Sequence, residues 1–194
     1  SAGTVTVQLA QGRDTRLRTA GAVLAADPFF RGAIVGNDKA AMATILAAQR
    51  QRAEVDLAML LDPHGRVLAG SDSIGRKRVS FPGLVSRADG GGGSRAVLRA
   101  ENRAWEVVAV PVGEAEPIAW LAMGILIDTA FARRLGNLTG LDATLLARVG
   151  QTQLVLGSSL DRLDATTLLG DLASTGARVG NPIEITTGGV EHVA

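Results

Sequence analysis

The sequence contains no cysteine, and this absence removes several kinds of chemistry at once. Without a thiol the chain has no disulfide, no thiolate nucleophile and no cysteine-ligated zinc site. Only two histidines are present, His64 and His192, and neither has a second histidine at the spacing that a helical metal site requires. We therefore expect neither a metal centre nor a cofactor.

A strong charge of either sign is also missing. The 194 residues carry a net charge of +1, with acidic and basic side chains interspersed. A nucleic-acid binder needs a concentrated basic face, so this charge pattern argues against DNA or RNA as a partner.

Long apolar runs are absent as well. A membrane-spanning helix needs roughly 18 to 20 consecutive apolar residues. The most apolar stretch here, residues 118–127, has only the length of a strand. The chain begins without methionine and without the pattern of a signal peptide. We interpret it as a piece of a longer protein.

Motifs of catalysis are equally scarce. Ser158 and Ser159 lie in no G-x-S-x-G elbow, and no histidine is placed to activate them. The glycines at 90–93 lack the lysine and hydroxyl residue of a phosphate-binding loop. We therefore expect that this chain is not an enzyme, and a hydrolase or transferase is the weaker hypothesis.

The first quarter of the chain predicts three helices. Asp27 followed by Pro28 is a typical helix start, Gly36 and Asn37 end that short helix, and Asp38 is placed to begin the next. Before them, a long helix is indicated by apolar residues within an arc of about 120°. Its apolar stripe consists of Val5, Leu9, Leu17, Ala20 and Leu24.

The periodicity then changes to that of strands. Residues 57–61 form an apolar run, residues 62–65 have the composition of a tight turn, and 67–69 return as a second strand. A loop with a short helix follows to residue 94, and we interpret its glycine run as a natural loop rather than an engineered linker. Three further strands make a meander: residues 95–100, 104–112 and 118–128.

A second unit repeats part of this order. Residues 129–138 predict a helix capped by Asp128 or Thr129, and strands follow at 141–149 and 153–157. A helix at 161–174 and a strand starting at 183 complete the pattern. We predict an α/β (α+β) fold in three parts: a helical stalk at 1–53, a PAS-like sheet at 54–130, and a smaller or truncated PAS-like module at 131–194.

Several short motifs resemble one known family. Residues 62–69, Asp-Pro-His-Gly-Arg-Val-Leu-Ala, resemble the D-x-x-G-x-V-L-A hairpin of PAS-like and Cache sensor domains. Residues 139–146 and 155–160 resemble the second module of double Cache sensors, and residues 110–112 with 119–126 resemble the closing hairpin of the first. The sequence departs from the amino-acid-binding members, because it has no tyrosine and lacks their tyrosine-containing motif.

This resemblance implies a function. Double Cache sensors are typically periplasmic, are flanked by membrane helices, and precede a histidine kinase, a cyclic-di-GMP (GGDEF/EAL) module or a chemoreceptor signalling region. We therefore expect an extracytoplasmic domain that binds a small molecule and dimerises through its N-terminal helix. One alternative is a sensor with an empty pocket that responds to a protein partner or to dimer geometry. Another is a cytosolic PAS or GAF-type regulatory domain.

Two places in the sequence are candidates for a ligand site. The basic cluster ending at Arg78 suits an anion, and the family places ligands between the sheet and this crossover; a solvated loop is the alternative. Trp105 and Val107 alternate on one strand and Trp120 on the next, and core packing is the alternative to a pocket between them. Asp128 is either a ligand contact or a helix cap. The predicted ligand-binding residues are Arg78, Phe81, Arg99, Trp105, Val107, Trp120 and Asp128.

Overall fold

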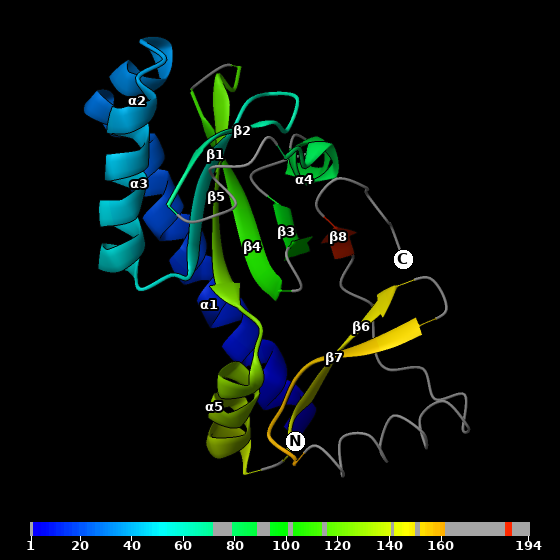
Figure 1. Ribbon diagram of the computed structural model, residues 1–194. Coiled ribbons are helices and arrows are strands. Elements are labelled where there is room, and N and C mark those ends of the chain that lie inside the picture. The colour runs from blue at the N-terminus through cyan, green and yellow to red at the C-terminus, as the bar shows by residue number, and fades with distance from the viewer. Residues whose placement is uncertain are drawn as a thin grey trace.

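A six-stranded sheet forms the centre of the protein, with the strand order β2-β1-β5-β4-β3-β8 (Figure 1). The computed structural model describes residues 2–71, 79–88, 94–100, 103–113, 116–140, 142–149, 152–161 and 185–187. The first five strands pair antiparallel, and only β8 joins in parallel. The strands are β1 (Leu57–Leu61), β2 (Val67–Gly70), β3 (Ser94–Ala100), β4 (Arg103–Val112), β5 (Ala119–Leu126) and β8 (Ile185–Thr187). The α+β fold class predicted from the sequence is confirmed.

Three helices precede the sheet, as predicted: α1 (Ala2–Ala25), α2 (Pro28–Val35) and α3 (Lys39–Ala53). The Asp27 carboxylate accepts hydrogen bonds from the backbone N–H groups of Phe29 and Phe30 at the start of α2. Asp38 does the same for Ala41 in α3. Both aspartates satisfy backbone donors that the first helical turn leaves without intrahelical partners.

The turn between β1 and β2 is held by one carboxylate. Asp62 Oδ1 accepts from the backbone N–H groups of His64 and Arg66, and Oδ2 accepts from Arg66 Nε at 2.7 Å. Gly65 closes the turn by donating to the Asp62 carbonyl at 2.9 Å, with a positive φ of 80°. The predicted hairpin is therefore confirmed, including the roles of aspartate and glycine in its turn.

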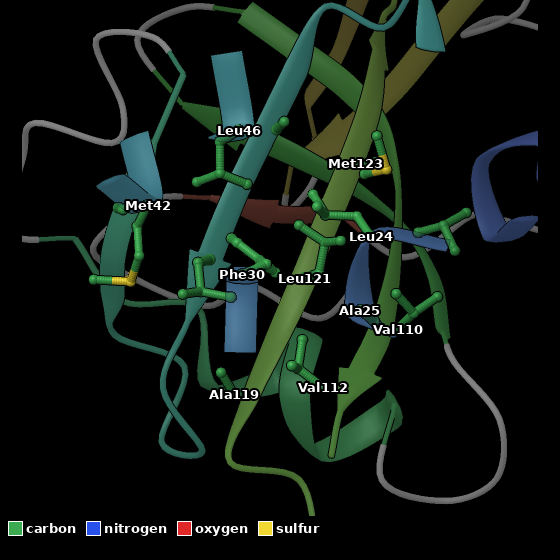
Figure 2. Packing of buried hydrophobic residues seen from close by; sticks show 14 of the residues in the cluster. Leu24, Ala25, Phe30, Met42, Leu46, Val110, Val112, Ala119, Leu121 and Met123 are labelled. Atoms are coloured by element: carbon green, nitrogen blue, oxygen red, sulfur yellow. The ribbon is translucent and has the colours of Figure 1, made fainter. Parts of the chain in front are cut away.

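The helices α1, α2 and α3 cover one face of the sheet (Figure 1). Side chains alternate between the two faces of a strand, so every second residue of β4 and β5 points to this layer. Figure 2 shows how Leu24, Phe30, Met42 and Leu46 from the helices meet strand residues such as Leu121.

A shorter helix, α4 (Pro82–Ala88), covers the opposite face near β3 and β4. The buried side chains between α4 and the sheet form a second core. This core includes Leu57, Met59 and Leu61 of β1, Leu84 and Val85 of α4, and both tryptophans.

Beyond the sheet lie helix α5 (Thr129–Thr139) and a hairpin of β6 (Thr144–Val149) and β7 (Thr152–Ser158). The hairpin docks against the start of α5, because Gly157 lies so close to the Asp128 carbonyl that any Cβ would overlap it. Leu156 of β7 also packs against Val97 and Ala104 of the main sheet.

The strand expected near residue 183 is β8, and it pairs with β3 of the main sheet. It was expected to belong to a second module, whereas the structure makes it part of the first sheet. The helix predicted at 161–174 falls almost wholly outside the described residues. The division into a stalk and two modules remains a prediction. Among the described residues, no helix combines the length and apolarity needed to cross a membrane.

Candidate functional site

Trp105 and Trp120 lie on the same face of the sheet, the face covered by α4. In the pairing of β4 with β5, Trp105 lies opposite Leu126 and Trp120 lies opposite Pro111. The two tryptophan rows are thus six positions apart along β4, which corresponds to about 20 Å. A pocket between the tryptophans requires both side chains to point to the same face of the sheet, and they do. We call this surface, with the side chains that cover it, the tryptophan face.

Between the two tryptophan rows, the floor of this face is built from small side chains. Ala109 of β4 pairs with Ala122 of β5, and Val107 pairs with Gly124. On the other side of Val107, Ala96 of β3 is its pairing partner. A Cβ on Gly124 would stand 2.7 Å from Val107 Cγ1, so the strands leave no room there for a larger residue. Small residues let whatever covers this face approach the sheet closely.

Phe81 and helix α4 cover the floor. Phe81 is fully buried in the same cluster as the tryptophans, together with Leu84, Val85 and Ala88 of the helix. The Phe81 N–H donates to the Gly65 carbonyl at 2.7 Å, and the N–H of Val67 donates to the carbonyl of Val79. The residues before α4 therefore pair with the outer edge of β2, which fixes the position of the cover.

Four of the predicted ligand residues thus belong to one buried cluster on the tryptophan face: Phe81, Trp105, Val107 and Trp120. Each has an exposed fraction of 3% or less, so core packing accounts for their positions in the structure as it stands. Arg78 lies outside the described residues. The role of all five in binding a ligand remains a prediction.

The structure does not bring Arg99 and Asp128 to this face. Arg99 pairs with Ala104, while its neighbour Leu98 pairs with Trp105, so the arginine lies on the opposite side of the sheet. The expectation that Arg99 reaches the tryptophan face from β3 is therefore corrected. Asp128 begins α5, where its Oδ1 accepts from the Phe131 N–H at 2.7 Å. It acts as the helix cap that the sequence offered as its alternative role.

A buried ion pair lies on the face of the sheet opposite the tryptophan face. Glu106 has an exposed fraction of 5%, and its Oε1 lies 2.5 Å from Arg95 Nη2 on β3. Within the described part of the chain, neither Glu106 Oε1 nor Arg95 Nε has a hydrogen-bond partner. Attraction between the two charges therefore carries this contact.

The environment of Asp62 in the β1–β2 turn lowers its pKa. Burial by itself would raise the pKa of Asp62. The hydrogen bonds from Arg66 and His64, together with the Arg66 charge, outweigh burial and hold this pKa below its usual value. The aspartate therefore has a structural role at the edge of the sheet.

Helix α1 packs on β4 and β5 from the side of the sheet opposite the tryptophan face. Gly21 lies against Val110 and Met123, and a Cβ on this glycine would stand 2.9 Å from Val110 Cγ2. Gln49 of α3, which is also buried, donates from Nε2 to the Ala20 carbonyl at 3.1 Å. One strand, β4, thus carries Val107 and Ala109 on the tryptophan face and Val110 against α1.

Two residues described by the structure, Glu106 and Asp56, were not predicted from the sequence. Glu106 was detectable, because it is the one acid within the apolar run of residues 104–112. Asp56, whose Oδ2 accepts from the Leu126 N–H at 2.7 Å and so joins the start of β1 to the end of β5, carried no comparable signal. Across the described residues, no three histidine, aspartate or glutamate side chains gather as a metal site.

Comparison with solved structures defines the class of fold. The periplasmic domain of Vibrio cholerae LuxQ superimposes with a TM-score of 0.59 at 16% identity, covering 82% of this chain and 78% of that one. The sensor domain of the V. cholerae histidine kinase DctB gives 0.57 at 14% identity, with 95% and 79% covered. The E. coli DcuS sensor domain gives 0.50 at 17% identity, with 59% and 89% covered. The fold is that of sensor domains.

The family follows from the sequence. The CHASE4 domain model matches residues 34–146, which run from the last two residues of α2 through α3, the strands β1 to β5 with α4, and α5 to the start of β6. This chain belongs to the CHASE4 domain family. No curated protein matches it. The double Cache arrangement inferred from short motifs remains a prediction.

Proposed function

We propose that this chain is the extracytoplasmic sensing domain of a transmembrane bacterial signalling protein, with any catalytic output carried by another part of that protein. It would bind a small molecule at the tryptophan face. The observation that carries this proposal is the floor of small residues between Trp105 and Trp120, covered by a separate short helix. Membership of the CHASE4 family and the likeness to periplasmic sensor domains support the setting.

The proposed ligand contacts combine apolar walls with one charge. Ligand pockets are mostly apolar and use a few polar groups to fix orientation. Phe81, Trp105, Val107 and Trp120 would supply the walls. Arg78 would supply the polar contact, since a guanidinium binds carboxylate or phosphate with two parallel hydrogen bonds. The proposed ligand is therefore a small anion with an apolar part.

Binding would reach α1 through β4. A ligand that lifts α4 or separates the tryptophan rows would change the twist of β4, because Val107 and Ala109 line the floor. Val110 on the reverse side touches Gly21, so the helix would follow. A ligand shifts such an equilibrium only by its difference in affinity for the two arrangements.

Thermal unfolding of the chain in the presence of small carboxylates, phosphates, amines, sugars and nucleotides tests the proposal. A ligand at about 100 times its dissociation constant adds roughly 2.7 kcal/mol of stability, and hence about 5 to 10 °C for a chain of this size. We expect an anionic compound to produce this shift in the wild-type chain.

Two variants locate the binding. Arg78→Ala should abolish the shift while leaving the unfolding temperature without ligand nearly unchanged. Arg52→Ala, at an exposed position near the end of α3, is the matched control and should keep the full shift. A compound that stabilises both variants equally would place the site elsewhere.

A second candidate function is a sensor of a protein partner, favoured by the exposed face of α2. Phe29 and Val35 are 85% and 78% exposed, and the other exposed positions of this helix are Pro28 and Gly32. An exposed face without charge is unusual on a soluble helix and is typical of interaction surfaces. Under this alternative no compound in the screen stabilises the chain, and Phe29→Ser abolishes signalling in the intact receptor without lowering stability.

The proposed homodimer through the N-terminal helix needs a probe at an exposed position of that helix. Leu17 is buried in the core against the sheet, so Leu17→Glu would unfold the domain rather than report on a dimer. Val23 is 66% exposed on the same helix. Val23→Glu should lower the dimer fraction in analytical ultracentrifugation while leaving the unfolding temperature unchanged.

A further inference from the structure

Strand β8 extends the sheet in a way that differs from all its other strands. It contributes three residues, pairing Ile185 with Val97, Thr186 with Leu98 and Thr187 with Arg99. This is the one parallel pair among the described strands, and parallel pairing is slightly weaker per residue than antiparallel pairing. Within the described residues, the pairing of β8 with β3 therefore consists of three residue pairs of the weaker parallel kind.

The strand β3 is longer than the stretch that the described residues of β8 pair with. β3 has seven residues, Ser94–Ala100, and each of them pairs with β4 along its inner edge. On the outer edge, the described residues of β8 pair with Val97, Leu98 and Arg99. A strand edge presents a row of backbone donors and acceptors that readily accepts another extended segment.

We propose that the outer edge of β3 is a strand-acceptor site, and that residues 185–187 of the same chain are its exchangeable occupant. Recognition would rest on backbone hydrogen bonds between the two extended segments. This site is separate from the tryptophan face and needs no ligand. An extended segment of matching sequence should therefore compete for it.

Because the chain contains no cysteine, a disulfide can form only between cysteines that are introduced by substitution. Neighbouring strands lie about 4.8 Å apart, which is within the Cα separation of about 4.4 to 6.8 Å that a disulfide spans. The variant Arg99→Cys with Thr187→Cys joins two paired residues. Arg99→Cys with Ile185→Cys is the matched control, because a two-residue offset raises the separation to about 8 Å.

Under mild oxidation, the paired variant should form an intramolecular disulfide, visible as a faster-migrating monomer on a non-reducing gel, and the control should not. A synthetic peptide of residues 181–190, added at about 1 mM, should slow this cross-link roughly twofold, since tethered segments have effective concentrations in that range. Equal cross-linking of the control would overturn the register. Cross-linked dimers without the monomer species would show that a second copy fills the site. An unchanged rate with the peptide would show that β8 does not exchange.

Discussion

Gly21 of α1 lies directly against Val110 of β4, where a single added carbon would stand 2.9 Å from Val110 Cγ2. Carbon atoms at a favourable contact are about 3.5 to 4.0 Å apart, so no side chain fits between this helix and the sheet without movement. The long helix thus contacts the sheet tightly behind the floor of the tryptophan face.

Gly21→Ala should therefore destabilise the protein. Overpacking costs typically 1 to 3 kcal/mol, while alanine gains about 1 kcal/mol of helix propensity, so a net loss of about 1 kcal/mol is expected in urea unfolding. Gly32→Ala in α2 is the matched control, because a Cβ there meets nothing within 4 Å and the helix gains up to about 1 kcal/mol. Equal stabilisation by both substitutions would contradict the close contact of α1 with β4.

Gly157→Ala should detach the β6–β7 hairpin from α5. The new methyl group would overlap the Asp128 carbonyl, which is backbone and cannot turn aside. Amide hydrogen exchange in residues 144–158 should accelerate, while exchange in β4 and β5 stays slow. Uniform acceleration across the chain would show instead that the hairpin and the main sheet unfold together.

Asp62→Asn should lower stability in a pH-dependent way. The folded-state pKa of Asp62 is lowered, so its contribution is complete above the unfolded value of about 3.9 and is lost as the pH falls through the folded value. The difference in unfolding free energy between wild type and variant should be constant near neutral pH and shrink below about pH 4.

Glu54→Gln is the control for this pH series. It removes an ion pair with Arg16 in which both side chains are exposed, and the unfolding free energy should change by less than about 1 kcal/mol. A gap between wild type and Asp62→Asn that stays constant down to pH 2 would contradict the lowered pKa.

Arg95→Met should destabilise the sheet more than the double variant with Glu106→Leu. The single change leaves the buried Glu106 carboxylate without its partner charge, which costs about 1 to 3 kcal/mol. Replacing both groups by apolar side chains removes that charge, so the double variant should recover most of the loss. Additive losses in a double-mutant cycle would show that the pair does not interact.

Features with a local cause were predictable from the sequence. The starts of α2 and α3 follow from Asp27 and Asp38, whose caps are formed within three residues along the chain. The β1–β2 turn is likewise held by hydrogen bonds within residues 62–66. Such signals survive in any tertiary setting because both partners lie in the same short segment.

The position of Arg99 was not predictable, because it depends on register. The sequence suggested a three-residue turn at 101–103, whereas β3 ends at Ala100 and β4 begins at Arg103. A shift of one residue moves every side chain of a strand to the other face. The pairing of β8 with β3 was hidden for a related reason, since it joins segments far apart in the sequence.

The most direct test of the central claim is a hydrogen-exchange comparison of the full chain with and without the compound that stabilises it most in the thermal screen. The account predicts slower exchange in α4, β4 and β5 and a change in α1 around residues 17–25, where the helix contacts Val110 and Met123. A protected α4 with unchanged α1 would contradict the proposed signal path. A screen in which no compound stabilises the chain would contradict the ligand-binding role itself.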